Sequence, residues 1–152
     1  MVNNVLILGN SGFIGSHVKT FFNNNVKNIK VSGISSAQAD LAETNNWSFV
    51  ENLWDRHTTI LMASAIKNTI EDNIFTYSKN MQMITNLCNS LQSKPANRII
   101  FLSSTAVYGD YSNNLSITEE TTTFSTVYKL PSINSETTDL ILDLLSLLAT
   151  PH

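Results

Sequence analysis

The sequence is poor in several kinds of residue, and each shortage excludes a class of protein. Its 152 residues include one cysteine, which excludes an internal disulfide and a cysteine-rich zinc site. Charged residues make up 14% of the chain and the formal net charge is −3, so a basic nucleic-acid-binding surface is not expected. No apolar run approaches the ~20 residues of a membrane span, and no signal peptide precedes the first apolar segment. We therefore expect a cytoplasmic protein that binds neither nucleic acid nor a membrane.

Metal chemistry is also disfavoured by what is missing. The histidines, His17, His57 and His152, are widely spaced and lack carboxylates at the short intervals typical of metal ligands. What the chain does have is apolar residues, at 42% of the total, and a length that can bury the core of one domain. We therefore expect a single domain over residues 1–152, without a metal site.

Short apolar runs alternate with amphipathic stretches along the chain. Strands are expected where apolar and β-branched residues cluster, at 2–8, 29–34, 58–65 and 98–103, with a further short strand leading into Asp40. Helices are expected from residue 13 to a turn at 23–25, over 45–53, over 70–91 and in the leucine-rich tail after residue 126. The apolar stripe of the helix over 70–91 consists of Ile74, Tyr77, Met81, Ile84, Leu87 and Leu91. This alternation predicts an α/β fold, with a doubly wound parallel sheet and helices on both faces in three layers.

A glycine-rich turn follows the first expected strand and opens the first helix. Its sequence, GNSGFIG, covers residues 9–15. Gly9 allows a tight turn, Gly12 lets backbone amides approach a pyrophosphate, and Gly15 lets the helix lie close to the sheet. Free amides and the helix dipole then favour bound phosphate. The pattern predicts a dinucleotide site in a Rossmann-like sheet, and a turn that serves packing alone is the alternative.

The longer sequence GNSGFIGSHV resembles the extended branch of the short-chain dehydrogenase/reductase family. That branch contains nucleotide-sugar epimerases, dehydratases and reductases. The resemblance implies that NAD or NADP is the cofactor and that this turn binds it. The residues implied here are Gly9, Gly12, Phe13, Ile14 and Gly15.

The choice between NAD and NADP stays open at the end of the second strand. An acidic side chain about 20 residues past the turn would bind the ribose 2′-hydroxyl of NAD. Ser35 and Ser36 stand there instead, and a serine hydroxyl can bond either a ribose or a 2′-phosphate. No arginine nearby favours NADP. Ser35 is therefore a candidate coenzyme ligand, and the alternative is that these serines only cap a turn.

Further positions match the family's coenzyme site. Asp40 and Leu41 match an Asp–hydrophobe pair whose carboxylate meets the adenine amino group, with helix capping as the alternative. Residues 62–65 (MASA) match a strand end that lines the coenzyme, or else they serve tight packing. Asn80 either holds the neighbouring strand region or faces solvent. The coenzyme contacts that the resemblance implies after Ser35 are Asp40, Leu41, Ala63, Ser64, Ala65, Lys67, Asn80 and Ser103.

The most specific match is the segment SSTAVYGD at residues 103–110. It closely resembles the family's SSxxVYGD segment after the fifth strand. In the family, the serine four residues before the tyrosine of VYG bonds the substrate hydroxyl or carbonyl, and that serine is Ser104 here. A hydroxyl that satisfies a local turn is the alternative.

The family pattern breaks at the general acid/base, a tyrosine followed four residues later by a lysine. Tyr128 matches the tyrosine, but Ser132 stands at the place of the lysine. Lys129 is about 100° around a helix from Tyr128 and would point elsewhere. A phenol with an ordinary pKa near 10 needs such a cation at neutral pH. We therefore expect the catalytic pair to be broken, and the alternative is that this stretch is misaligned and another group supports the phenol. For Tyr128 itself, an ordinary half-buried aromatic is the alternative.

Two functional hypotheses follow from the resemblance. In the first, Tyr128 removes a hydroxyl proton, Ser104 orients the oxygen, and NAD(P) takes a hydride from a carbon of a nucleotide sugar. In the second, the chain is a truncated or degenerate module that binds a dinucleotide or a partner without turnover. The matched motifs cover the family's N-terminal half, so no substrate domain is expected. The apolar helix near the C-terminus predicts a homodimer interface.

Overall fold

The computed structural model describes residues 4–66 and 74–103 of the chain. These residues, Ser103 apart, belong to one compact unit, Met1–Leu102. The helix expected after residue 126 and the dimer interface assigned to it lie outside the described residues. A single domain over residues 1–152 therefore stays a prediction.

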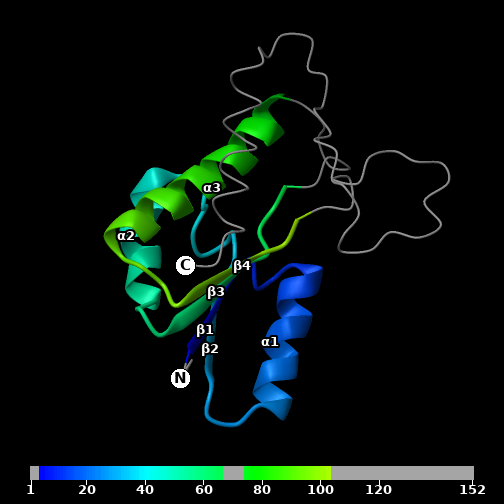
Figure 1. The fold of residues 1–152 in the computed structure, drawn as a ribbon. Helices are drawn as coiled ribbons and strands as arrows, with labels where there is room; N and C mark the ends of the chain where they lie inside the picture. The colour runs from blue at the N-terminus through cyan, green and yellow to red at the C-terminus, as the bar shows by residue number, and fades with distance from the viewer. Residues whose placement is uncertain (1–3, 67–73, 104–152) are drawn as a thin grey trace, which may run out of the picture. The chain divides into compact units, whose positions relative to one another are not determined.

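The described part of the chain folds around a sheet of parallel strands (Figure 1). The strands are β1 (Asn4–Leu8), β2 (Lys30–Ile34), β3 (Thr58–Met62) and β4 (Arg98–Phe101), in the order β2-β1-β3-β4. In the register, Leu8 at the end of β1 lies between Ile34 of β2 and Met62 of β3. The carboxyl ends of these strands therefore meet at one edge of the sheet. The predicted parallel sheet is confirmed.

The strand order creates a switch point between β1 and β3. From β1 the chain crosses to β2 on one side, and it later returns to place β3 on the other side. Loops that leave the carboxyl ends of two such strands diverge and open a crevice, where ligands of open α/β sheets bind. The loops in question follow Leu8 and Met62.

Helices cover both faces of the sheet, as predicted (Figure 1). Helix α1 (Phe13–Asn25) connects β1 to β2 on one face. The other face carries α2 (Trp47–Val50) and α3 (Ile74–Ser93), with the 3-10 turns η1 (Thr44–Asn46) and η2 (Glu51–Leu53) on either side of α2. The helix expected over 45–53 is thus three short helical segments.

Successive side chains of β1 point to opposite faces of the sheet and so belong to two separate apolar clusters. Leu6 and Leu8 of β1 enter the larger cluster, where residues from α2, α3 and the segment 39–42 meet. Val5 and Ile7 enter the smaller cluster, with Val18 and Phe22 of α1 packed against it. Every residue of β3 is buried, as expected of a strand covered on both faces.

The structure corrects the expected strands at three places. The strand expected over 98–103 ends at Phe101. The short strand expected before Asp40 is wrong, because this segment forms a turn in which the Gln38 and Ala39 amides donate to the Ser35 carbonyl. The strand expected over 58–65 ends at Met62. The Ala63 amide still donates to the Leu8 carbonyl at 2.8 Å, but β1 ends there and offers no further partner.

The buried face of α3 also differs from the expected stripe. Leu87 is buried as expected, but Ile74 is 45% exposed, and Met83, which the stripe did not include, is buried. Three polar residues share the buried face, namely Thr76, Asn86 and Ser90. A pattern of apolar residues alone misplaces this face, since buried polar groups are tolerated where they are hydrogen-bonded.

No helix within residues 4–66 and 74–103 is both long and apolar enough to cross a membrane.

Candidate functional site

The turn after β1 is built on Gly9, whose backbone has φ +95°. A side chain is strained at such an angle. A Cβ atom here would also lie 2.7 Å from Ser64 Oγ and 2.9 Å from the Ala63 carbonyl oxygen. The amides of Gly9 and Asn10 both donate to the Ile34 carbonyl, at 2.8 and 3.0 Å. The turn is therefore fixed between the ends of β2 and β3, and the predicted role of Gly9 is confirmed.

Gly12 and Gly15 differ in what surrounds them. A Cβ atom on Gly15 would collide with the Gly9 carbonyl oxygen, so α1 approaches the turn as closely as a backbone can. A Cβ atom on Gly12 would meet only that same oxygen, at the ordinary contact distance of 3.4 Å. Nothing in the described residues therefore requires glycine at position 12. The space beside it is available to a ligand.

The first turn of α1 presents open backbone donors. Gly12 is the N-cap and provides no side-chain cap. The Ser16 amide closes the first helical bond, to the Gly12 carbonyl at 2.9 Å. Within the described residues, the amides of Phe13, Ile14 and Gly15 have no acceptor, as in the first turn of any uncapped helix. Phe13 and Ile14 are 76% and 50% exposed, whereas Gly15 is buried.

Asn10 and Gly33 form a contact that sequence reasoning missed. A Cβ atom on Gly33 would lie 2.5 Å from the Asn10 Cβ and 2.7 Å from its Nδ2. The Asn10 side chain therefore rests on β2 where that strand has no side chain of its own. The sequence signal was a glycine inside a strand, which often marks a close approach of another group.

The loop after β3 is held by Asn80 of α3. The Asn80 Oδ1 accepts from the Ile66 amide at 2.8 Å, and its Nδ2 donates to the Ile66 carbonyl at 2.9 Å. The side chain thus replaces a strand partner for Ile66. The prediction that Asn80 holds this region is confirmed, and the solvent-facing alternative is wrong. Ala63 and Ser64 are half-buried beside Gly9, whereas Ala65 is exposed.

Ser35 directly follows β2, and its amide, hydroxyl and carbonyl all bond to Gln38. Its amide and its hydroxyl both reach the Gln38 Oε1, at 3.1 and 3.0 Å. Its carbonyl accepts from the Gln38 amide at 3.0 Å. Ser35 therefore closes a turn, which was the alternative to a coenzyme contact. The Ser35 hydroxyl keeps its lone pairs, so a coenzyme contact stays a prediction.

Asp40 and Leu41 lie in a loop whose main chain is fixed from α3. One Asp40 carboxylate oxygen accepts from the Ala42 amide at 2.9 Å, which is a local cap. Leu41 is buried in the core, and its carbonyl accepts from Trp47 Nε1 at 2.8 Å, so its predicted coenzyme contact stays a prediction. Asn86 donates to the Leu41 and Ala42 carbonyls at 3.1 and 3.2 Å and is 3% exposed. Sequence reasoning missed Asn86.

β4 brings one further predicted residue to the same edge of the sheet. The Leu102 amide donates to the Met62 carbonyl at 3.2 Å, and the exposed Ser103 follows. Three other predicted residues, Lys67, Ser104 and Tyr128, lie outside the described residues.

The described residues fit the pyrophosphate of a dinucleotide. Gly9 and Gly15 bring α1 against the turn, a Cβ atom on Gly12 would meet no described atom closer than 3.4 Å, and the amides of the first turn of α1 have no acceptor among the described residues. An anion gains both from these donors and from the helix dipole. The switch point between β1 and β3 thus brings together the glycine turn, the loop after β3 and the residue after β2.

A model of the NAD dependent epimerase/dehydratase family matches residues 5–131. The chain belongs to this family. The match starts in β1 and contains every candidate residue of the site. The family is NAD(P)-dependent, in agreement with the predicted cofactor. No curated protein matches the chain.

Solved structures of the epimerase/dehydratase type share the fold. ADP-L-glycero-D-manno-heptose-6-epimerase from Helicobacter pylori is 22% identical with a TM-score of 0.68, over 95% of this chain and 50% of that one. UDP-glucose 4-epimerase from Bifidobacterium longum, in complex with NAD+ and UDP, is 22% identical with a TM-score of 0.64, over 95% and 48%. GDP-L-fucose synthetase from Naegleria fowleri, bound to NADP, is 21% identical with a TM-score of 0.65, over 94% and 43%. The chain thus spans about half the length of these proteins.

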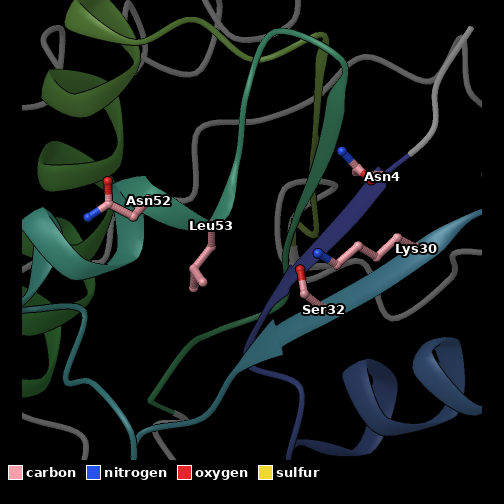
Figure 2. A pocket seen from close by; sticks show the side chains of 5 residues that line it. All are labelled: Asn4, Lys30, Ser32, Asn52 and Leu53. Carbon is pink, nitrogen blue, oxygen red and sulfur yellow. The ribbon is translucent and has the colours of Figure 1, made fainter.

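A small pocket lies away from the glycine turn (Figure 2). It has a volume of about 130 Å³ and is lined by Asn4, Lys30, Ser32, Asn52 and Leu53. Asn4 and Lys30 begin β1 and β2, so the pocket adjoins the amino ends of strands whose carboxyl ends carry the glycine turn. It is not part of the candidate site. Residues 4–66 and 74–103 contain no group of three side chains that could hold a metal ion.

Proposed function

We propose that this chain binds NAD or NADP at the glycine turn and serves hydride transfer at a sugar carbon of a nucleotide sugar. The observation that carries the proposal is the turn itself. Gly9 and Gly15 are in backbone contact, and the first-turn amides of α1 are open beside Gly12. Membership of the epimerase/dehydratase family supports the same coenzyme.

In this proposal, different described residues bind different parts of the coenzyme. The amides of Phe13, Ile14 and Gly15 hold the pyrophosphate, since they lack acceptors in the described part of the chain. Ser35 and Asp40 flank the adenosine. The small residues 63–65 line the loop after β3, which Asn80 fixes. Bound NAD(P) supplies a hydride acceptor and donor.

The chemical step falls to residues outside the described ranges. In the proposal Ser104 donates a hydrogen bond that orients the sugar oxygen, and Tyr128 takes or returns the hydroxyl proton. An ordinary tyrosine pKa of about 10 makes this transfer slow at neutral pH unless a cation stabilises the phenolate. The substrate class is proposed from the nucleotide-sugar enzymes that share the fold.

Binding without turnover is the second candidate function. It is favoured by Ser132, which stands at the place of the lysine that would support Tyr128. In this case the chain holds a dinucleotide and presents it, or itself, to another molecule.

Titration calorimetry with NAD and with NADP tests the coenzyme claim. Wild-type protein is expected to release or absorb heat with one of them at least. Gly12→Ala is the matched variant, because its methyl group meets nothing in the described part of the chain closer than 3.4 Å but enters the space in which we propose that the pyrophosphate binds. It is expected to fold and to bind at least tenfold more weakly, an estimate based on ~1.4 kcal/mol of lost phosphate contact. Absence of heat in wild type, or equal affinity in both proteins, would contradict the proposal.

Turnover separates the two candidate functions. UDP-, GDP- and dTDP-sugars are incubated with coenzyme and either wild type or Ser132→Lys, and products are separated chromatographically. Activity that rises in Ser132→Lys supports the enzyme with a weakened acid/base pair. Coenzyme binding with both proteins inactive supports the binding module.

A further inference from the structure

The end of β2 offers no ionic means of choosing between NAD and NADP. Residues 31–39, VSGISSAQA, contain no charged side chain. Lys30 begins the strand, about 16 Å of extended chain away from Ser35. Asp40 follows the segment, and its negative charge does not favour a 2′-phosphate. Any selection by this segment therefore depends on the direction of neutral hydrogen bonds.

The polarity of the bonds between Ser35 and Gln38 is fixed by the main chain. A backbone amide can only donate, so the Gln38 atom 3.1 Å from the Ser35 amide must be its oxygen, Oε1. The Ser35 Oγ lies 3.0 Å from that same oxygen. Since Oε1 is an acceptor only, the Ser35 hydroxyl must donate its proton there. The free lone pairs of the Ser35 hydroxyl can then accept a hydrogen bond from a ligand, but its proton is already donated to Gln38.

Ser35 lies next to the glycine turn, so we place the ribose beside a bound pyrophosphate within its reach. It follows Ile34, whose carbonyl accepts the amides of Gly9 and Asn10 from the phosphate turn. A ribose 2′-hydroxyl is a donor and satisfies the Ser35 oxygen. A 2′-phosphate presents acceptor oxygens, so it would need the Ser35 proton and would break the bond to Gln38.

We propose that Gln38 is a positioning residue that holds the Ser35 hydroxyl as an acceptor and so makes the chain prefer NAD over NADP. The inference rests on the proposed coenzyme site and deepens it. Gln38 itself need not touch the coenzyme. It acts through the three bonds that join it to Ser35.

The test is the ratio of the dissociation constants of NADP and NAD, measured by calorimetry. Wild type is expected to bind NAD more tightly. Gln38→Met keeps the size of the side chain but removes the acceptor, which releases the Ser35 proton. The ratio is expected to fall about three- to tenfold, the factor that one net hydrogen bond is worth. Gln38→Glu keeps an acceptor for both donors, adds a negative charge, and is expected to retain or raise the ratio.

Two further variants keep the inference open to contradiction. Gln92→Met makes the same change at an exposed position of α3 and is expected to leave the ratio unchanged. Ser35→Ala removes the acceptor itself and is expected to weaken NAD binding more than NADP binding, even if Gln38→Met does not fold. Thermal melting verifies that each variant is folded.

The outcomes separate this inference from the function on which it rests. A wild type that binds neither coenzyme overturns both. A wild type that prefers NADP, or a ratio that is equal in wild type and Gln38→Met, overturns the role of Gln38 and leaves the coenzyme site standing. A fall in the ratio for Gln38→Met with retention in Gln38→Glu supports the inference.

Discussion

The two faces of the sheet hold the loops of the candidate site by opposite means. On the α1 face, backbone lies on backbone, because Gly15 leaves no side chain between the helix and Gly9. On the α3 face, amide side chains span the gap, with Asn80 bound to Ile66 and Asn86 bound to Leu41. The first arrangement is sensitive to added atoms and the second to removed ones. Mutations that add and remove atoms therefore test the two faces separately.

An added methyl group at position 15 is expected to have the largest effect. Gly15→Ala forces Cβ against the Gly9 carbonyl oxygen, so α1 and the turn must move apart. We expect the free energy of unfolding to fall by about 3 kcal/mol, at the upper end for overpacking. Urea denaturation measures it. In Gly12→Ala the new contact is an ordinary one, and a loss of about 1 kcal/mol is expected from the poorer N-cap. Equal losses would contradict the assigned difference between these glycines.

Removal of the buried amide of Asn86 is expected to have the next largest effect. Its Nδ2 serves the Leu41 and Ala42 carbonyls, and its Oδ1 accepts from Gln82 at 2.9 Å. Asn86→Ala leaves the Ala42 carbonyl without its donor and the Leu41 carbonyl with Trp47 Nε1 alone, and we expect a loss of about 2 kcal/mol in urea denaturation. The exposed Asn89 on the same helix is the control, and Asn89→Ala is expected to change stability by less than about 0.5 kcal/mol. Similar losses in both variants would mean that Asn86 does not hold the loop.

The smallest effect is expected at Asp55, which belongs to neither face and precedes β3. The His57 amide and the Thr58 hydroxyl donate to its Oδ1 and lower the pKa of the carboxyl group from 3.8. A lowered folded pKa stabilises the protein above the unfolded value, and this stability is lost as the pH falls through the folded value. Asp55→Asn removes that dependence. Melting temperatures from pH ~6 to ~2 should converge for the two proteins at the acid end, and parallel curves would contradict the assignment.

Local features of the chain were predictable from the sequence. The strands β1 and β2 were placed within a few residues, because each is a short apolar run bounded by turn residues. The roles of Gly9 and Gly15 were predictable because glycines at that spacing between a strand and a helix leave few alternatives. The coenzyme class followed from the same turn.

Contacts between distant segments could not be predicted in this way. Asn86 meets Leu41 across 45 residues of sequence, and an apolar pattern assigns a polar residue to the outside of a helix. The approach of Asn10 to Gly33 depends on the direction of one side chain. The Ser35–Gln38 pair is local, but its bonds form only in a turn where a strand had been expected. The positions of Ser104 and Tyr128 are the part of the site that rests on resemblance alone.

The hydrogen bonds accepted by the Ile34 carbonyl determine the order in which the site forms during folding. This carbonyl accepts the amides of Gly9 and Asn10, so the glycine turn takes its final shape only when β2 has paired with β1. The turn is local in sequence, yet its closure depends on a strand that follows the whole of α1. A ligand bound at the turn would therefore stabilise β1, α1 and β2 as a unit, by mass action on their pairing. In hydrogen exchange, the Gly9 and Asn10 amides should open together with the β1–β2 ladder rather than with the surface loops.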